Sequence, residues 1–391
     1  MTIALTVIAV LCIVGLPAPI VWLTRKSKIL GAIGAIACCY LVGFAFSTIG
    51  LSGTSYNKGL TTTIAYVMVA LSIPLILFSI DLRSVKRLTK NTVIGYSMCI
   101  ISVVAVSIAA FFITRSMAVD GVDLSAMIVG LYTGGTPNMN AIGAAMGAEN
   151  SVISAANVSD TVVGGIYFLL LISVLPKAYR FLLKRKKQQT VEQIEPEYSE
   201  EKIDDFAFNI SINDKKSILK LAGAFLLAIG CVGVGALLEL LIDKTVGENL
   251  LYILLSVSVL GVAFSFIKPV REIKGQYTLG MYLILMFSLA LSMSIDWSVF
   301  LTDILPTMLF FVCAQVSVIV LHLILCRIAR VDGDTAIITS TAGIYGPPFI
   351  APVAKATNRA DLIAPGVICG ALGLAIGTLL GIGVGQLLLL F

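Results

Sequence analysis

Long apolar runs separated by short polar loops make up most of the chain. Ten of these runs are about 20 residues long, the length of helix that crosses a bilayer. They cover residues 3–23, 29–51, 61–82, 93–114, 158–183, 218–242, 250–267, 277–295, 305–328 and 362–391. We expect an all-α polytopic membrane protein. The first run has no preceding basic residues and no small-residue cleavage site after it, so we expect a retained membrane helix.

Two further apolar segments are broken by glycine and proline. The first, roughly 125–147, contains Tyr132-Thr-Gly-Gly-Thr-Pro-Asn-Met-Asn140, and the second, roughly 335–356, contains Thr339-Ser-Thr-Ala-Gly-Ile-Tyr-Gly-Pro-Pro-Phe349. Unpaired backbone within a bilayer persists only where it is buried in protein or lines a wet cavity. Two such breaks at corresponding places in two halves of a chain are typical of the binding site of a secondary transporter. The alternative is a packing kink in each segment.

The positions of lysine and arginine decide whether the broken segments cross the membrane. Basic clusters lie near Arg25, Arg83, Arg180, Arg271 and Arg327. Because such residues gather on the cytoplasmic side, full crossing would violate the rule by separating the second cluster from the third. If both segments are re-entrant, every cluster falls inside, and five spans per half turn the second half upside down. We therefore predict two inverted repeats of about five spanning helices, each with one discontinuous or re-entrant segment.

The repeats divide the chain into three parts. The first transmembrane repeat covers 1–187 and the second covers 217–391, while 188–216 is a polar, acidic stretch too hydrophilic for a membrane. We expect this stretch to be a cytoplasmic linker. The repeat is weakly visible in the sequence, since Phe78-Ser-Ile-Asp81 resembles Met293-Ser-Ile-Asp296.

The broken segments carry the candidate binding residues. Half-helices that meet within a membrane aim unpaired backbone groups and dipole ends at one point. We expect the two tips to meet there and form one site for a sodium ion or a polar solute. The candidates around the first break are Thr133, Gly134, Gly135, Thr136, Pro137, Asn138, Asn140, Asn157, Ser159 and Asp160, and those of the second half are Ser340, Thr341, Tyr345, Gly346, Pro347 and Asp361. The candidate sodium ligands are Thr136, Asn138 and Asp160.

Ionisable residues inside apolar spans are the next signal. Asp160 and Asp361 each stand at the edge of a predicted span, where a carboxylate is costly and usually faces a protein interior or an ion path. The alternative is that each aspartate caps the helix it precedes. We place Glu239 near the outer face, within reach of water. His322, the single histidine, is more typical of an interhelical hydrogen bond than of a proton carrier.

Composition excludes several classes of protein. With 58% hydrophobic and 13% charged residues and a mean hydropathy of +1.00, the chain lies far from soluble proteins. The net charge of +5 sits in short loops, which membrane orientation explains, so we expect no nucleic-acid partner. The eight cysteines lack paired spacing, and no nucleophile–base pair or phosphate loop is present. We expect no enzyme and no cofactor; a homodimer stays open.

At these residues the chain resembles a known family. The stretch Tyr132-Thr-Gly-Gly-Thr-Pro-Asn-Met-Asn-Ala-Ile-Gly143, followed by Ser159-Asp160-Thr-Val-Val163, is similar to the YjcL-like integral membrane proteins, domain of unknown function number 819. The resemblance covers the whole chain and implies a bacterial inner-membrane protein. It also implies membership of a wider group of cation antiporters, bile-acid sodium symporters and auxin carriers, built from inverted repeats with crossed discontinuous helices. Our loop-charge count differs in favouring re-entrance.

The sequence as a whole favours a secondary active transporter. We expect it to move a small polar or anionic organic solute by alternating access, coupled to sodium, from a multi-pass position in the bacterial plasma membrane. Sodium is favoured because neutral hydroxyl, amide and carbonyl oxygens outnumber titratable groups at the breaks. The alternatives are an ion-binding channel or membrane sensor, and a proton-coupled exchanger. Some relatives implied by the resemblance are connected with recycling of cell-wall peptides, which suggests a small peptide or other organic anion.

Overall fold

The computed structural model describes residues 2–27, 30–31, 34–48, 55–83, 88–114, 121–183, 215–242, 250–294 and 297–391. Every regular element in these ranges is helical. Residues 188–214 of the predicted linker lie outside the described residues, as does Asp296 of the repeat motif. The second half begins its first helix at Lys215, two residues before the predicted start of the repeat.

Eight helices of the described part are long and apolar enough to cross a membrane. They are Val7–Lys26, Gly59–Phe78, Lys90–Thr114, Asn150–Ser173, Lys215–Ile242, Gln276–Met293, Phe300–Ile328 and Ile363–Leu388. Two shorter apolar helices, α4 (Ala35–Thr48) and α13 (Leu250–Ser265), stand where the sequence predicts two more spans. The ten predicted spans therefore all fall on helices.

Two of the predicted spans are each divided into two helices. The first is divided into α1 (Thr2–Gly15) and α2 (Pro17–Lys26), with Pro17 at the first position of the second piece. The span predicted from residue 158 begins earlier, as α9 (Asn150–Ser173), and its end forms a separate helix, α10 (Leu175–Leu182). Pro176 sits in the first turn of α10, where its missing N–H is tolerated.

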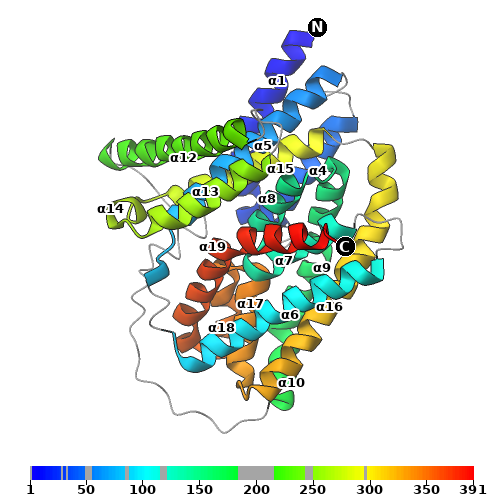
Figure 1. Ribbon diagram of the computed structural model, residues 1–391, viewed down its shortest axis with the longest axis vertical. Coiled ribbons are helices and arrows are strands. Elements are labelled where there is room, and N and C mark those ends of the chain that lie inside the picture. The colour runs from blue at the N-terminus through cyan, green and yellow to red at the C-terminus, as the bar shows by residue number, and fades with distance from the viewer. Residues whose placement is uncertain are drawn as a thin grey trace.

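Contacts between the helices divide them into two bundles, most of the first in the upper part of Figure 1 and most of the second in the lower part. The upper bundle packs the first helices of each half together, and the lower bundle packs the last ones. The upper bundle consists of α1, α2, α4, α5 (Ser55–Phe78), α12 (Lys215–Ile242), α13 and α15 (Gln276–Met293). The lower bundle consists of α6 (Lys90–Thr114), α7 (Gly121–Gly134), α8 (Thr136–Met146), α9, α16 (Trp297–Ile328), α17 (Gly333–Tyr345), α18 (Ile350–Ala356) and α19 (Ile363–Leu388). Both halves thus follow one order of elements.

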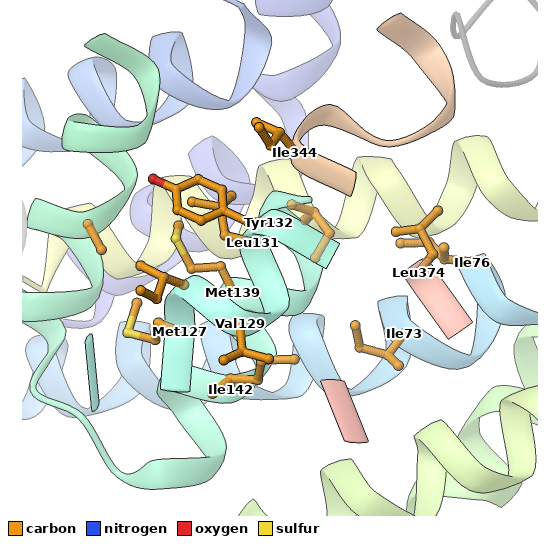
Figure 2. Packing of buried hydrophobic residues seen from close by; sticks show 14 of the residues in the cluster. Ile73, Ile76, Met127, Val129, Leu131, Tyr132, Met139, Ile142, Ile344 and Leu374 are labelled. Atoms are coloured by element: carbon orange, nitrogen blue, oxygen red, sulfur yellow. The ribbon is translucent and has the colours of Figure 1, made fainter. Parts of the chain in front are cut away.

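The first broken segment folds back on itself. The chain reverses at Gly135, whose φ of 105° is open to glycine and strained for other residues. An ideal Cβ on Gly143 of α8 would lie 3.2 Å from the sulfur of Met127 on α7, so the arms touch along their length. Figure 2 shows Met127 and Ile142 packed between these arms. The segment is a helical hairpin with a buried interior.

The second broken segment also reverses. Its first arm, α17, ends at Gly346, with a φ of 71°, and the chain continues through the 3-10 turn η2 (Pro347–Phe349) into α18. Asp334, in the first turn of α17, lies 3.2 Å from Arg359, which follows α18. Because that ion pair joins the two ends of the segment, its base is closed and its tip is the break at Gly346.

A stripe of glycines on α19 holds the first hairpin. Gly373, Gly377, Gly381 and Gly385 recur every four residues and therefore share one face of the helix. An ideal Cβ on Gly381 would lie 3.0 Å from the carbonyl oxygen of Ala126, and one on Gly385 would lie 2.8 Å from the sulfur of Met146. Small residues allow this close approach, which in membrane proteins supplies packing energy between helices.

Candidate functional site

The tips of the two hairpins lie in contact inside the lower bundle. An ideal Cβ on Gly135 would lie 3.7 Å from the carbonyl oxygen of Tyr345, and one on Gly343 would lie 2.7 Å from that of Tyr132. Figure 2 shows Tyr132 and Ile344 on the two facing segments. The two glycine breaks, more than 200 residues apart in the sequence, are therefore neighbours, and the polar residues around them can act together.

Asp160 lies beside this junction. The hydroxyl of Thr136, at the start of α8, donates a 3.1 Å hydrogen bond to Asp160 Oδ2. Tyr345, from the second tip, donates a 2.6 Å hydrogen bond to the carbonyl of Gly164, one turn after Asp160. Both hairpin tips thus contact the same stretch of α9. Because α9 begins at Asn150, Asp160 stands in the helix interior, and the interpretation of Asp160 as a helix cap is wrong.

A pair of buried amides adjoins the junction. The Asn157 amide nitrogen donates to Asn140 Oδ1 over 2.6 Å and to the Ile153 carbonyl over 2.7 Å. Within the described structure, this leaves Asn140 Nδ2 and Asn157 Oδ1 buried without a hydrogen-bond partner. A buried amide group without a partner costs roughly 1–3 kcal/mol. These two unpaired amide atoms are therefore available to bind a further group.

Two serine hydroxyls add to the unpaired polar atoms on α9. Ser159 and Ser154 are fully buried, and neither hydroxyl has a hydrogen-bond partner in the described ranges. Ser154 precedes Asn157 by three residues and so shares its helix face. Ser154 was not among the sequence candidates; its small polar side chain one turn before Asn157 is the signal that could have identified it.

Asn138 fastens the first hairpin to α19, while the Thr133 hydroxyl bonds within its own helix. Asn138 donates a 3.1 Å hydrogen bond to the Gly373 carbonyl and accepts one of 3.1 Å from Thr378, both on α19. The hydroxyl of Thr133 donates to the Val129 carbonyl within its own helix. The Asn138 side chain thus bonds to α19 and not to Asp160, so the structure separates it from the other two sodium candidates.

The other first-hairpin candidates are backbone elements of the break. Gly134 ends α7, and an ideal Cβ there would lie 2.5 Å from the Gly373 carbonyl. Pro137 occupies the first turn of α8, where it fixes the backbone without losing a helical hydrogen bond. Both residues therefore shape the tip, while the polar contacts come from their neighbours.

The candidate residues of the second hairpin contact α9, α19 or their own helix. Ser340 lies 3.3 Å from the hydroxyl of Tyr167 on α9, and Thr341 donates a 2.7 Å bond to the Ile337 carbonyl inside α17. Gly346 and Pro347 form the break and pack on α19, where an ideal Cβ on Gly370 would lie 2.8 Å from the nitrogen of Pro347. Tyr345 is the member of this set that reaches the neighbourhood of Asp160.

Asp361 lies far from the tips, so its placement in the predicted site is wrong. It precedes α19 in the turn η3 (Ala360–Leu362) and accepts a 2.7 Å hydrogen bond from Arg359, which also binds Asp334. Since α17 runs for 13 residues from this base to the tip, about 20 Å of helix separates Asp361 from Tyr345. Hydrogen bonding by the Arg359 guanidinium holds the pKa of the Asp361 carboxyl below its usual range. Asp361 makes no side-chain cap of α19 either.

Two buried polar residues, His322 and Glu239, lie outside the hairpins. His322 Nε2 lies 3.1 Å from the carbonyl of Gly95, so it links α16 to α6, the interhelical role expected for it. Glu239 is fully buried, which corrects its predicted position within reach of water. In the described part of the chain, no three His, Cys, Asp or Glu side chains gather as a metal site.

Comparisons with known proteins agree with the membrane character of the chain. It is 24% identical over 366 residues to a protein of Bacillus subtilis (strain 168) described as uncharacterized membrane protein YjcL. The match covers 92% of this chain and 90% of that relative. A family model described as protein of unknown function (DUF819) matches residues 11–391. Because that match extends over nearly the whole sequence, the chain belongs to the DUF819 family of membrane proteins.

Proposed function

We propose that the protein is a sodium-coupled secondary transporter for a small polar or anionic organic solute. One observation carries the proposal: unpaired buried amide and hydroxyl groups collect on α8 and α9, beside Asp160, where two glycine-broken hairpins meet. Discontinuous helices with this arrangement are the usual location of substrate and ion sites in secondary transporters. The proposed coupling-ion ligands are Asp160 and Thr136, with Asn157 Oδ1 and Ser154 as further neutral oxygens.

The chemistry of these groups favours a monovalent cation. They offer one carboxylate and several neutral oxygens, while the described residues hold no cluster of three metal-binding side chains. A carboxylate inside a membrane protein needs a compensating positive charge. Among the described residues no lysine, arginine or histidine forms a salt bridge with Asp160, so a bound sodium ion or a proton would supply that charge.

The arrangement of the bundles supports alternating access. The first hairpin and α9 belong to the lower bundle, yet α8 packs against α5 and α13, and α9 packs against α15, all of the upper bundle. A relative movement of the bundles would therefore open or close the proposed site. We include in the proposal that the halves are inverted repeats, that both hairpins are re-entrant, and that the protein lies in the bacterial plasma membrane with 188–216 in the cytoplasm.

The test is thermal unfolding of the purified full chain in sodium chloride and in potassium chloride at equal ionic strength. Sodium at about 100 times its dissociation constant stabilises the folded state by about 2.7 kcal/mol, so the sodium sample should unfold at a temperature higher by a few degrees. Asp160→Asn should remove this difference. Asp361→Asn is the matched control, because it deletes the same charge far from the tips and should keep the sodium effect.

The alternatives give different results in the same preparation. Equal unfolding temperatures in the two salts, combined with solute uptake that follows a pH gradient, would replace sodium by protons. Sodium currents through single molecules in the absence of any solute would indicate a channel. Saturable exchange that accelerates when solute is present on both sides of the membrane would support the transporter.

A further inference from the structure

A groove on the outside of the lower bundle is separate from the proposed transport site. It has a volume of about 960 Å³, within the usual range of about 300–1,000 Å³ for small-molecule sites. One wall is the end of α10, with Phe181 and Leu182, and the other is the last part of α16, with Val320 and Ile324. The side chains of these four residues are exposed, so the described structure leaves the walls of the groove uncovered.

The polarity of the groove changes along α16. Val320, Leu323 and Ile324 line its apolar part, and Arg327 and Arg330 follow in the next turns of the chain. From Val320 to Arg327 the helix rises about 10 Å, which is a considerable part of one leaflet of a bilayer. None of the described lining residues is acidic. An apolar slot that ends in two guanidinium groups matches a molecule with a hydrocarbon chain and an anionic head.

The position of the arginines identifies the leaflet. Arg327 also donates a hydrogen bond to the Leu182 carbonyl, which ties the end of α16 to α10 and uses one of its five N–H groups. Lys177 and Arg180 also lie on α10, at this end of the bundle, and Arg180 pairs with Asp334. Lysine and arginine accumulate on the cytoplasmic side, where the membrane surface is rich in anionic lipids.

We infer that this groove binds one anionic phospholipid of the cytoplasmic leaflet. An acyl chain would lie against Phe181, Val320 and Ile324, and the phosphate would receive hydrogen bonds from Arg327 and Arg330. Guanidinium groups bind phosphate through paired N–H donors. The site should therefore prefer phosphatidylglycerol to phosphatidylcholine, in which a positively charged choline lies beside the phosphate. Such a lipid would brace α10 against α16, next to the base of the second hairpin, where Arg180 pairs with Asp334.

The test measures thermal unfolding of the detergent-purified full chain with added phosphatidylglycerol, phosphatidylcholine or inorganic phosphate. Phosphatidylglycerol should raise the midpoint by several degrees, and the other two should have less than half of that effect. The double variant Arg327→Gln, Arg330→Gln should lose most of the shift. The control Lys215→Gln, Lys220→Gln removes the same charge from α12, in the other bundle, and should keep it.

A second variant tests the contribution of the acyl chain to binding separately from that of the charged head. Ile324→Trp fills the apolar slot and keeps both arginines, so it should also weaken the phosphatidylglycerol effect while the protein stays monodisperse. Equal shifts with both phospholipids, or a full shift with inorganic phosphate, would overturn the site. A rise in the unfolding midpoint with a peptide of residues 190–205, together with no rise with phosphatidylglycerol, would also overturn the site. It would assign the groove to the acidic part of this chain.

Discussion

Thr136 donates a 3.1 Å hydrogen bond to Asp160, and this contact joins the tip of the first hairpin to the interior of α9. The carboxylate therefore stands where a movement of either hairpin changes its surroundings. Tyr345 reaches the same place from the other hairpin through the Gly164 carbonyl. In the proposed transporter, a carboxylate at this position would couple the binding of an ion to the binding of a solute.

We predict that Thr136→Val weakens sodium binding. The substitution removes one of the proposed oxygen ligands, and a ligand that contributes about 1.4 kcal/mol to sodium binding changes the sodium concentration at half effect by about tenfold. The measurement is the unfolding midpoint as a function of sodium concentration. Thr133→Val is the control, because that hydroxyl bonds to the Val129 carbonyl in its own helix. Equal sodium responses in both variants would contradict the role of Thr136.

We predict that Gly373→Ala destabilises the fold strongly. An added methyl group would overlap the Thr133 carbonyl and the Tyr96 hydroxyl, which donates a 2.7 Å hydrogen bond to that carbonyl. Overpacking costs about 1–3 kcal/mol or more where backbone must move. Gly383→Ala on the same helix meets nothing within 4 Å and should be neutral or stabilising by up to about 1 kcal/mol. Thermal unfolding of the two variants checks the comparison.

We predict an acid-dependent contribution from Asp361 to stability. Because Arg359 lowers the carboxyl pKa in the folded state, the contribution is present above the unfolded value of about 3.9 and is lost as the pH falls through the lower folded value. Asp361→Asn should therefore unfold at a lower temperature than the wild type at pH 7. The two proteins should converge at pH values below the lowered folded pKa of Asp361. A difference that is independent of pH would indicate that the ion pair has no part in it.

We predict that both ends of the second hairpin react from one side of the membrane. The Asp334–Arg359 pair closes the base, so the residues before α17 and after α18 should share a compartment. Single cysteines from Arg327→Cys and Arg359→Cys, in a background without the eight natural cysteines, should both react with an impermeant maleimide only from the cytoplasmic side. A cysteine at Ser199, in the predicted linker, marks that side. Labelling of the two positions from opposite sides would show a crossing segment.

Hydropathy predicted the helices well and their buried ends poorly. The span predicted from residue 158 begins at Asn150 in the structure, because its first two turns are surrounded by protein and need no lipid-compatible residues. Serine and asparagine in these turns lowered the apolar signal, yet Ser151, Ser154 and Asn157 are buried. Because the start of this helix was predicted too late in the chain, Asp160 was expected in its first turn and could be interpreted as a cap. A hydropathy pattern measures affinity for lipid and does not predict which surfaces of a helix face other helices.

The sequence by itself determined the helical membrane character and the two break points, because apolar length and the backbone freedom of glycine and proline are local properties. It also identified Thr136, Asn157 and Asp160 as candidates. Only the tertiary structure decided that the breaks touch, that Asn138 holds α19, and that Asp361 belongs to an ion-pair cluster about 20 Å away along α17. These facts depend on the packing of helices distant in the chain, which no local pattern specifies.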